Sequence, residues 1–401
     1  RVVMAMGAGI SLPLMMTVIT NIFPPEKIGV PMGMGGLVIG LAPAIGPTYG
    51  GWILSGNTKF LGILQLGDWR TLFLAPFVLL IIVTVLTPFL MADVLPNRNM
   101  KLDFISLLES LLGFGLFLYG FTNVGNDGWG DAQSVIAPII IGLLIIAFFI
   151  RRQLHMADPF LDLSVFKIKQ FTVTTIAAAI NTMAMMGVEM MLPTYIQNVH
   201  GLTALQSGLL LLPGSVMMAL MSPIAGGIYD KFGAKKLSFI GFILLAIGTL
   251  PYLFLTATTP EAFITITYWV RFVAIGLIMM PLITSGMNAL PVEKSAQGSA
   301  SNNTVRMIAA SGVVAILASV TTNVINSTKP THHLSTTNPL QYADKMIQAS
   351  LNGFHVSFGI AFGFAVLGIF VALFLHEEKV APAPVREANK QEVIEDGGQN
   401  S

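Results

Sequence analysis

Long apolar segments recur along the whole chain, and each is long enough to cross a lipid bilayer as a helix. A spanning helix needs about 20 mostly apolar residues. Only 10% of the 401 residues are charged and 54% are hydrophobic, whereas soluble domains carry about a quarter charged residues. The sequence therefore predicts an all-α polytopic membrane protein. We predict eleven spanning segments, at residues 1–22, 30–54, 69–91, 104–124, 134–151, 171–193, 205–228, 237–257, 261–287, 299–322 and 354–376.

Basic residues divide the connecting loops into two sets. One alternating set of loops contains eleven Lys and Arg residues, among them Lys27, Lys231, Lys235 and Lys294, and the other set contains four. Loops rich in Lys and Arg stay in the cytoplasm. We therefore place the first set, together with the charged tail 377–401, on the cytoplasmic side. The tail has no apolar periodicity and is predicted to be disordered.

A sequence pattern occurs twice, about 270 residues apart. In each copy an arginine precedes a glycine, a Pro-Leu pair and a proline followed by Glu-Lys. The copies run from Arg1 through Pro13 to Lys27 and from Arg271 through Pro281 to Lys294. Duplicated helical bundles around a site at the bilayer midplane are typical of secondary transporters. The repeat therefore predicts a two-bundle transporter.

Glycine and proline are concentrated in the second predicted span, which ends in Gly46-Pro47-Thr48-Tyr49-Gly50-Gly51. In a soluble helix such residues are unfavourable. In hydrocarbon, small residues four apart let two helix backbones approach closely. We interpret the run as a helix-packing motif, with Gly50→Leu expected to impair transport without changing substrate preference.

The chain resembles the Major Facilitator Superfamily, and within it the 14-span drug:proton antiporters of the EmrB/QacA type. The resemblance rests on motifs spread along the chain up to residue 376. These are Arg1 to Gly9, like that family's fourth helix; Gly46 to Gly51, like its fifth-helix antiporter motif; Asp68-Trp69-Arg70; Leu192-Pro193 to Pro213-Gly214; Gly227-x-x-Asp230-Lys231-x-Gly233-x-Lys235-Lys236, like its cytoplasmic hinge loop; and Asn302, Asn303 and Arg306, like its thirteenth helix.

The resemblance implies that the eleven spans are helices 4 to 14 and that the first three helices are absent. Met4 and Ala5 depart from the family's usual Gln and Gly. The implied units are the remainder of an N-terminal six-helix bundle (1–91), an inserted helix pair (92–151), a cytoplasmic linker (152–170), a C-terminal six-helix bundle (171–376) and the tail (377–401).

Charged residues inside apolar segments are costly and usually mark a pathway or an internal pair. Arg1, Arg271 and Glu189 are therefore candidates for a proton relay or for substrate binding, and Arg1→Ala is expected to abolish efflux. The alternatives are arginines that reach the outer interface and a carboxylate near the headgroups. Asn302 and Arg306 are further candidates for the cavity, and helix-to-helix hydrogen bonding is the alternative for the asparagines.

In the predicted hinge loop, Asp230 is expected to act on a helix end as a latch between helices. Gly227, Gly233, Lys231 and Lys235 belong to the same motif, although the lysines also fit a simple positive-inside cluster. His332-His333 has no further ligand at metal spacing, so we interpret it as loop. We expect no metal and no cofactor.

The resemblance implies proton-coupled export of amphipathic, often cationic drugs across a bacterial cytoplasmic membrane, by a monomer that binds no nucleic acid. Transport of one metabolite remains the alternative. A membrane enzyme is disfavoured because no nucleophile-base or paired-acid arrangement is found on the apolar segments. Repeated filter loops of a channel and the phosphate-binding loop of an ATP-driven pump are also missing from the sequence.

Overall fold

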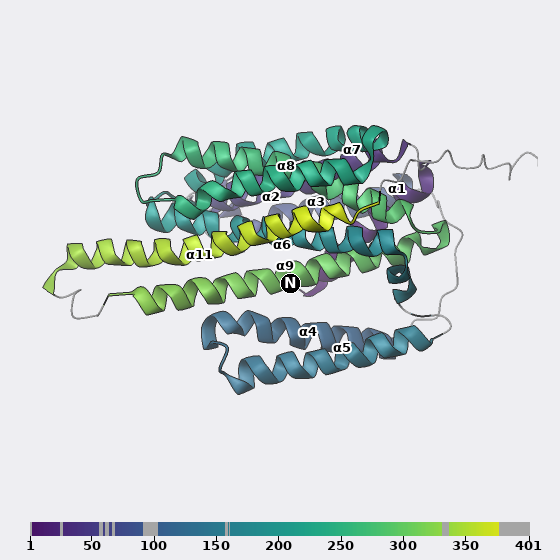
Figure 1. Cartoon of the computed structure of the whole chain (residues 1–401), viewed down its shortest axis with the longest axis horizontal. Helices are drawn as coiled ribbons and strands as arrows, with labels where there is room; N and C mark the ends of the chain where they lie inside the picture. The colour runs from purple at the N-terminus through teal and green to yellow at the C-terminus, as the bar shows by residue number, and fades with distance from the viewer. Residues whose placement is uncertain are drawn as a thin grey trace, which may run out of the picture.

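The computed structural model describes residues 2–24, 27–55, 59–60, 64–65, 69–90, 103–156, 159, 161–330 and 337–376. These residues are almost entirely helical, and the helices run along a common long axis (Figure 1). Nine helices in this part of the chain are long and apolar enough to cross a membrane. The predicted all-α membrane architecture is therefore confirmed.

Three helices open the chain. They are α1 (Val2–Ile22), α2 (Gly29–Ser55) and α3 (Thr71–Leu90). Their bounds agree to within two residues with the predicted spans. A small antiparallel pair of strands, β1 (Lys59–Phe60) and β2 (Leu64–Gln65), lies between α2 and α3 and was not predicted.

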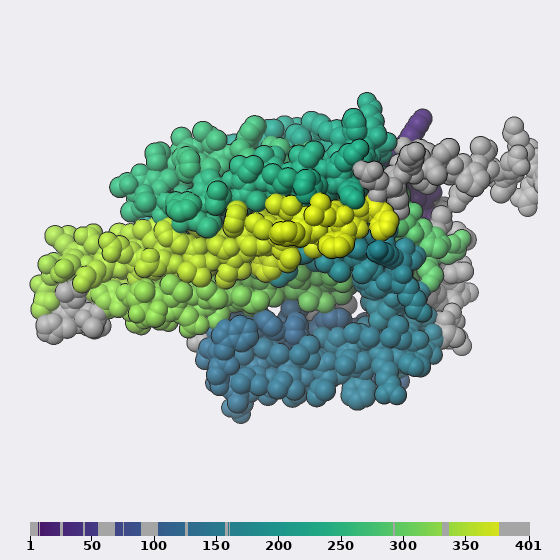
Figure 2. Space-filling model, in the orientation of Figure 1, coloured from purple at the N-terminus to yellow at the C-terminus, as the bar shows by residue number. Residues whose placement is uncertain are grey.

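The next helices form a hairpin. It consists of α4 (Phe104–Asp127), the short π-helix η2 (Ala132–Ile136) and α5 (Ala137–His155). Asp103 and Asp131 cap the N-termini of α4 and η2 by accepting backbone N–H groups. The two helices touch closely because a Cβ on Gly142 would lie 2.5 Å from the Phe117 nitrogen. Helix α4 packs against α9 (Ser295–Thr328), and a hollow lies beside part of the hairpin (Figure 2).

The remaining helices form a compact bundle that contains most of the buried core. They are η3 (Leu163–Lys167), α6 (Lys169–Val199), α7 (Ala204–Thr249), η4 (Leu250–Phe254), α8 (Glu261–Asn288), η5 (Val292–Lys294), α9 (Ser295–Thr328) and α11 (Pro339–Leu373). Phe171, Tyr195, Phe242, Phe272 and Phe358 are fully buried among them. This bundle corresponds to the predicted C-terminal unit.

The predicted count of eleven spans is not confirmed, for two physical reasons. The predicted spans 205–228 and 237–257 lie within one continuous element, Ala204–Phe254, in which two helices meet at a kink at Gly233. There φ is 75°, a conformation that L side chains rarely adopt, so glycine is required. In α1 the apolar stretch within the described side chains, Gly9–Ile22, is shorter than a span.

The described residues between the predicted spans 299–322 and 354–376 are largely helical. Helices α9 and α11 contain 34 and 35 residues, or about 50 Å each at 1.5 Å per residue. That exceeds the hydrocarbon core of about 30 Å, and both helices project beyond the others at the left of Figure 1. Residues His332-His333 and the tail 377–401 lie outside the described residues.

Candidate functional site

Arg271 lies inside the C-terminal bundle. Its side chain is fully buried. The guanidinium Nε donates to the Thr249 hydroxyl at 3.0 Å, and Nη2 donates to the backbone carbonyl of Ala184 on α6. Helices α7 and α8 meet closely here, since a Cβ on Gly248 would lie 3.1 Å from the Arg271 nitrogen. The cation therefore points into the helical interior and not toward the outer interface.

Glu189 on α6 carries a carboxylate oxygen close to this arginine. Its Oε2 atom is buried and has no hydrogen-bond partner among the described residues, and the same holds for Arg271 Nη1. The charges of Glu189 and Arg271 interact, although no ion pair joins them. Tyr268, one turn before Arg271, is also buried and interacts with both charges. The site thus holds a carboxylate and a guanidinium, each with an atom that forms no hydrogen bond to a described residue.

A small cavity lies where the first helices meet the C-terminal bundle. Its lining comes from α1, α2, α8 and α9, with Leu12, Pro13, Met16, Ile39, Ile283, Met287, Ser299, Asn302, Asn303 and Arg306. Its volume is about 30 Å³. That is room for a water or two, whereas drug-sized ligands occupy several hundred Å³. In this conformation the described walls are therefore closed around the cavity.

The polar side chains of α9 border the cavity along one face of the helix. Asn302 donates to the Thr175 hydroxyl at 3.2 Å, and Arg306 Nε donates to the Thr182 hydroxyl at 3.3 Å. On the N-terminal side of the cavity, the Ser299 hydroxyl donates to the Pro13 carbonyl at 3.2 Å. Helix α9 therefore links α6 to α1.

Helix α2 packs along α7 through glycines on both helices. A Cβ on Gly226 would clash with the Gly29 carbonyl oxygen, and one on Gly51 would lie 2.6 Å from the Leu205 Cα. A Cβ on Gly208 would lie 2.9 Å from the Pro47 carbonyl group. A larger side chain at these positions would force the two backbones apart.

The predicted packing motif is only partly used in this crossing. A Cβ on Gly46 would meet no described atom within 4 Å, and one on Gly50 would reach only a Leu72 methyl, at 4.0 Å. The close contact is made one residue later, by Gly51. Helix α2 is apolar on all faces, so hydrophobic periodicity does not identify which glycine faces α7.

Asp230 lies within α7, three residues before the break at Gly233, and adjoins the start of α2. Its Oδ1 accepts the backbone N–H of Gly29 at 3.0 Å. A carboxylate at a helix N-terminus satisfies a free donor and complements the helix dipole. The expected contact of Asp230 with a helix end is therefore present. Lys231 and Lys235 form no ion pair or side-chain hydrogen bond with a described residue, so their role in the hinge stays a prediction.

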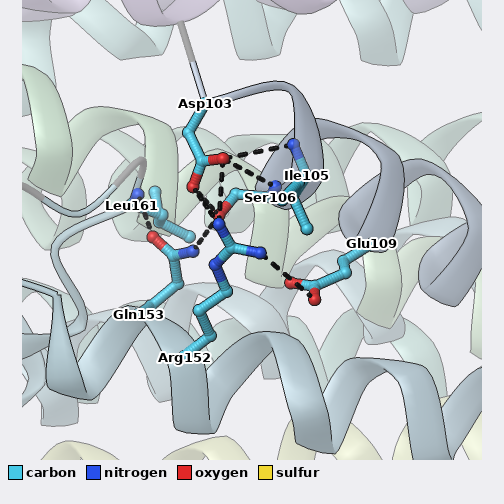
Figure 3. A network of polar contacts seen from close by, with 7 residues as sticks. All are labelled: Asp103, Ile105, Ser106, Glu109, Arg152, Gln153 and Leu161. Carbon is cyan, nitrogen blue, oxygen red and sulfur yellow. Dashed lines mark hydrogen bonds and ion pairs between the residues drawn. The ribbon is translucent and has the colours of Figure 1, made fainter. Parts of the chain in front are cut away.

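A polar network joins the two helices of the hairpin at one end (Figure 3). Arg152 pairs with Asp103 at 3.1 Å and with Glu109 at 3.6 Å. The Ser106 hydroxyl donates to Asp103 at 2.6 Å, and this bond, reinforced by backbone donors and Arg152, lowers the pKa of Asp103. Glu109 is thus part of an ion pair in the first turns of α4.

The same network continues into the linker. Gln153, buried on α5, donates to the Ser106 hydroxyl at 2.7 Å and accepts the Leu161 N–H at 3.0 Å (Figure 3). The next residue, Asp162, donates its N–H to Gln297 of α9 at 3.1 Å and pairs with Lys294 at 2.8 Å. The hairpin is therefore connected through the linker to the α8–α9 corner.

Comparison with known proteins identifies the family. The profile described as "Major Facilitator Superfamily" matches residues 1–314. The chain belongs to the Major Facilitator Superfamily. It is 38% identical over 98% of its length to the "Uncharacterized MFS-type transporter YcnB" of Bacillus subtilis strain 168, of which the match covers 76%. It is 34% identical over 94% of its length to 77% of the "Lincomycin resistance protein LmrB" of Listeria innocua. It is 26% identical over 88% of its length to 67% of the "Multidrug export protein EmrB" of Escherichia coli K12.

The similarity to LmrB and EmrB supports the predicted resemblance to the EmrB type. Members of this superfamily are transporters, so the chain is a multi-pass membrane protein of a non-enzymatic family. Groups of His, Asp and Glu that could hold a metal ion are not found among the described residues.

The fold gathers the candidate residues of this superfamily member into two places. Glu189 and Arg271 lie inside the bundle, close enough for their charges to interact, whereas Asn302 and Arg306 border the cavity. Arg1 lies outside the described residues, so its pairing with Arg271 in the sequence repeat stays a prediction. Asn181 is buried, and its Oδ1 has no partner among the described residues.

Several polar residues of these sites were not predicted. Thr249 accepts from the buried Arg271 and Thr182 from the half-buried Arg306. Asp162 and Gln297 connect the linker to α9. A lone threonine in an apolar helix carries little signal, because its hydroxyl can bond to its own helix backbone. Asp162 could have been predicted, because an acidic residue in a basic linker is expected to pair with a nearby lysine, here Lys294.

Proposed function

We propose that this chain belongs to a proton-coupled antiporter that exports amphipathic drugs or other toxic compounds from a bacterial cell. The names of LmrB and EmrB support drug export, and the positive-inside pattern supports a cytoplasmic C-terminus. The observation that carries proton coupling is the buried, unpaired carboxylate oxygen of Glu189 near the buried guanidinium of Arg271.

The Glu189 carboxylate can bind or release a proton without breaking a hydrogen bond at Oε2, because this atom has no partner among the described residues. When Glu189 is ionised, the attraction to Arg271 favours approach of α6 and α8. When Glu189 is protonated, that attraction is lost and its hydroxyl needs a new acceptor. Since each state favours a different arrangement of nearby helices, protonation shifts the population between two conformations.

The glycine contacts between α2 and α7 supply the surface along which the two halves would move. They are smooth, because backbone touches backbone at Gly226 and Gly51. The bond from Gly29 N–H to Asp230 then acts as a latch at one end of this surface. The cavity lies between the same halves, so rocking about the interface would widen it.

The test uses everted membrane vesicles from cells that express the complete gene. Energised vesicles should take up a fluorescent amphiphile, and collapsing the pH gradient with nigericin should stop the uptake. Glu189→Gln should abolish uptake driven by the pH gradient but retain substrate exchange across an unenergised membrane. Uptake that persists without a pH gradient would reject proton coupling.

The metabolite hypothesis makes a different prediction in the same vesicles. A transporter of one metabolite would take up none of a panel of chemically diverse amphiphiles. That result would replace drug export by the narrower function.

A further inference from the structure

The cavity between the first helices and the C-terminal bundle has a distinct charge character. Arg306 is the charged residue among the described residues that line it, and no carboxylate is present in that lining. Arg306 forms no ion pair with a described residue. Only its Nε has a hydrogen-bond partner there, the Thr182 hydroxyl. The two terminal nitrogens of the guanidinium are therefore unused donors at the cavity wall.

The surrounding side chains extend this donor surface. Ser299, Asn302, Asn303 and Arg306 are spaced three or four residues apart, so they share one face of α9. Opposite them, Met16 and Met287 provide apolar walls. Methionine side chains are flexible and adapt to ligands of different shape. The cavity thus combines one polar, cationic wall with adaptable apolar ones.

Deepening the proposed function, on which it rests, we infer that Arg306 selects amphiphiles that carry an anionic group, such as a carboxylate. A guanidinium binds a carboxylate through two parallel hydrogen bonds. A cationic drug in the same place would meet like charge in a poorly solvated cavity, which is unfavourable. Arg306 is therefore a specificity-determining residue, distinct from the proton-coupling pair Glu189 and Arg271. The sequence alone had favoured cationic drugs.

The experiment compares two dyes that share a xanthene ring but differ in charge. Carboxyfluorescein is the anionic probe and rhodamine 6G the cationic one. Binding of each to the purified complete protein is measured by fluorescence anisotropy. Arg306→Gln should weaken carboxyfluorescein binding about tenfold to a hundredfold, the worth of a charge-assisted hydrogen bond. Rhodamine binding should be unchanged or tighter.

Arg306→Lys is the matched variant, because it keeps the charge and loses the planar fork. It should bind the anion better than Arg306→Gln but less tightly than wild type. Equal losses for both dyes in Arg306→Gln would overturn the proposal and assign Arg306 to folding or coupling instead. Unchanged anion binding would also overturn it.

A measurement on the wild type covers the case in which Arg306→Gln does not fold. An amphiphilic carboxylic acid should displace bound carboxyfluorescein, whereas its uncharged methyl ester should not. Equal displacement by acid and ester would refute the inference. The proposed function can hold even if this inference fails. If everted vesicles took up only rhodamine, and nigericin stopped that uptake, proton-coupled export would stand and selection of anions by Arg306 would be wrong.

Discussion

Helices α3 and α6 differ in a way that locates function in this molecule. The spanning part of α3 has a mean hydropathy of 2.6 and none of it is buried, whereas that of α6 has a mean hydropathy of 1.5 and 72% of it is buried. Helix α8 resembles α6, because its spanning part has a mean hydropathy of 1.8 and 72% of it is buried. The more apolar helix is thus the more exposed one, because lipid is the solvent. The polar residues that matter are found where a helix is surrounded by other helices.

The largest effect is expected when the buried positive charge of Arg271 is removed. Arg271→Met should destabilise the protein by about 3 kcal/mol, because it removes the bonds of the buried guanidinium to Thr249 and Ala184 and the positive charge near the Glu189 carboxylate. Transport should be lost as well. The measurements are thermal unfolding in detergent and uptake by everted vesicles.

The matched control is Leu79→Ala on α3, whose side chain is 63% exposed. It should change the free energy of unfolding by less than about 0.5 kcal/mol. If the Leu79 variant were as unstable as the Arg271 variant, the contrast between lipid-facing and bundle helices would be wrong.

A second pair of variants tests which face of α2 packs against α7. Gly51→Leu should cost about 1–3 kcal/mol, since its side chain would press into the Leu205 backbone. Gly46→Leu has no described atom near its Cβ and should be neutral or slightly stabilising. Thermal unfolding and transport rate are measured for both. Equal effects at the two positions would mean that α2 does not cross α7 as described.

How far the sequence predicts this structure depends on the kind of signal. Hydropathy located the helices because membrane thickness sets their minimum length. It did not predict the helical ends of α9 and α11, since a helix can continue into water after the apolar residues end. The interior position of Arg271 followed from the cost of a charge in lipid. The sequence did not predict that Gly51 and not Gly46 contacts α7, because an all-apolar helix has no polar face that indicates its orientation.

The latch at Asp230 gives a smaller expected effect. Asp230→Asn keeps a hydrogen-bond acceptor for the Gly29 N–H but removes the negative charge, so the loss should be about 0.5–1 kcal/mol. The variant should also change transport rate more than substrate affinity, if release of the latch accompanies the conformational change. Lys231→Gln is the control, being exposed and next in sequence. A larger effect of the lysine variant would assign the hinge to positive charge instead of to helix capping.

The smallest expected effect lies outside the membrane, at the ion pair that joins the linker to the α8–α9 corner. Burial by itself would raise the pKa of Asp162. The hydrogen bonds from Lys294 and Ser164, together with the positive charge of Lys294, outweigh that effect, so the pKa of Asp162 is lowered. A folded-state pKa below the unfolded value means that the stabilisation is present above about pH 4 and is lost as the pH falls through the folded value. The pair is partly exposed, so its contribution is at most about 0.5 kcal/mol.

The unfolding temperatures of wild type and Asp162→Asn should therefore differ near neutral pH and converge below about pH 4. Asp344→Asn on the exposed N-terminal part of α11 is the control and should leave the unfolding temperature unchanged, since the Asp344 side chain forms no ion pair with a described residue. A difference between wild type and Asp162→Asn that stays constant at low pH would show that the amide disturbs packing. The linker would then be held by the bond from Asp162 N–H to Gln297, which involves no ionisable group, and not by charge.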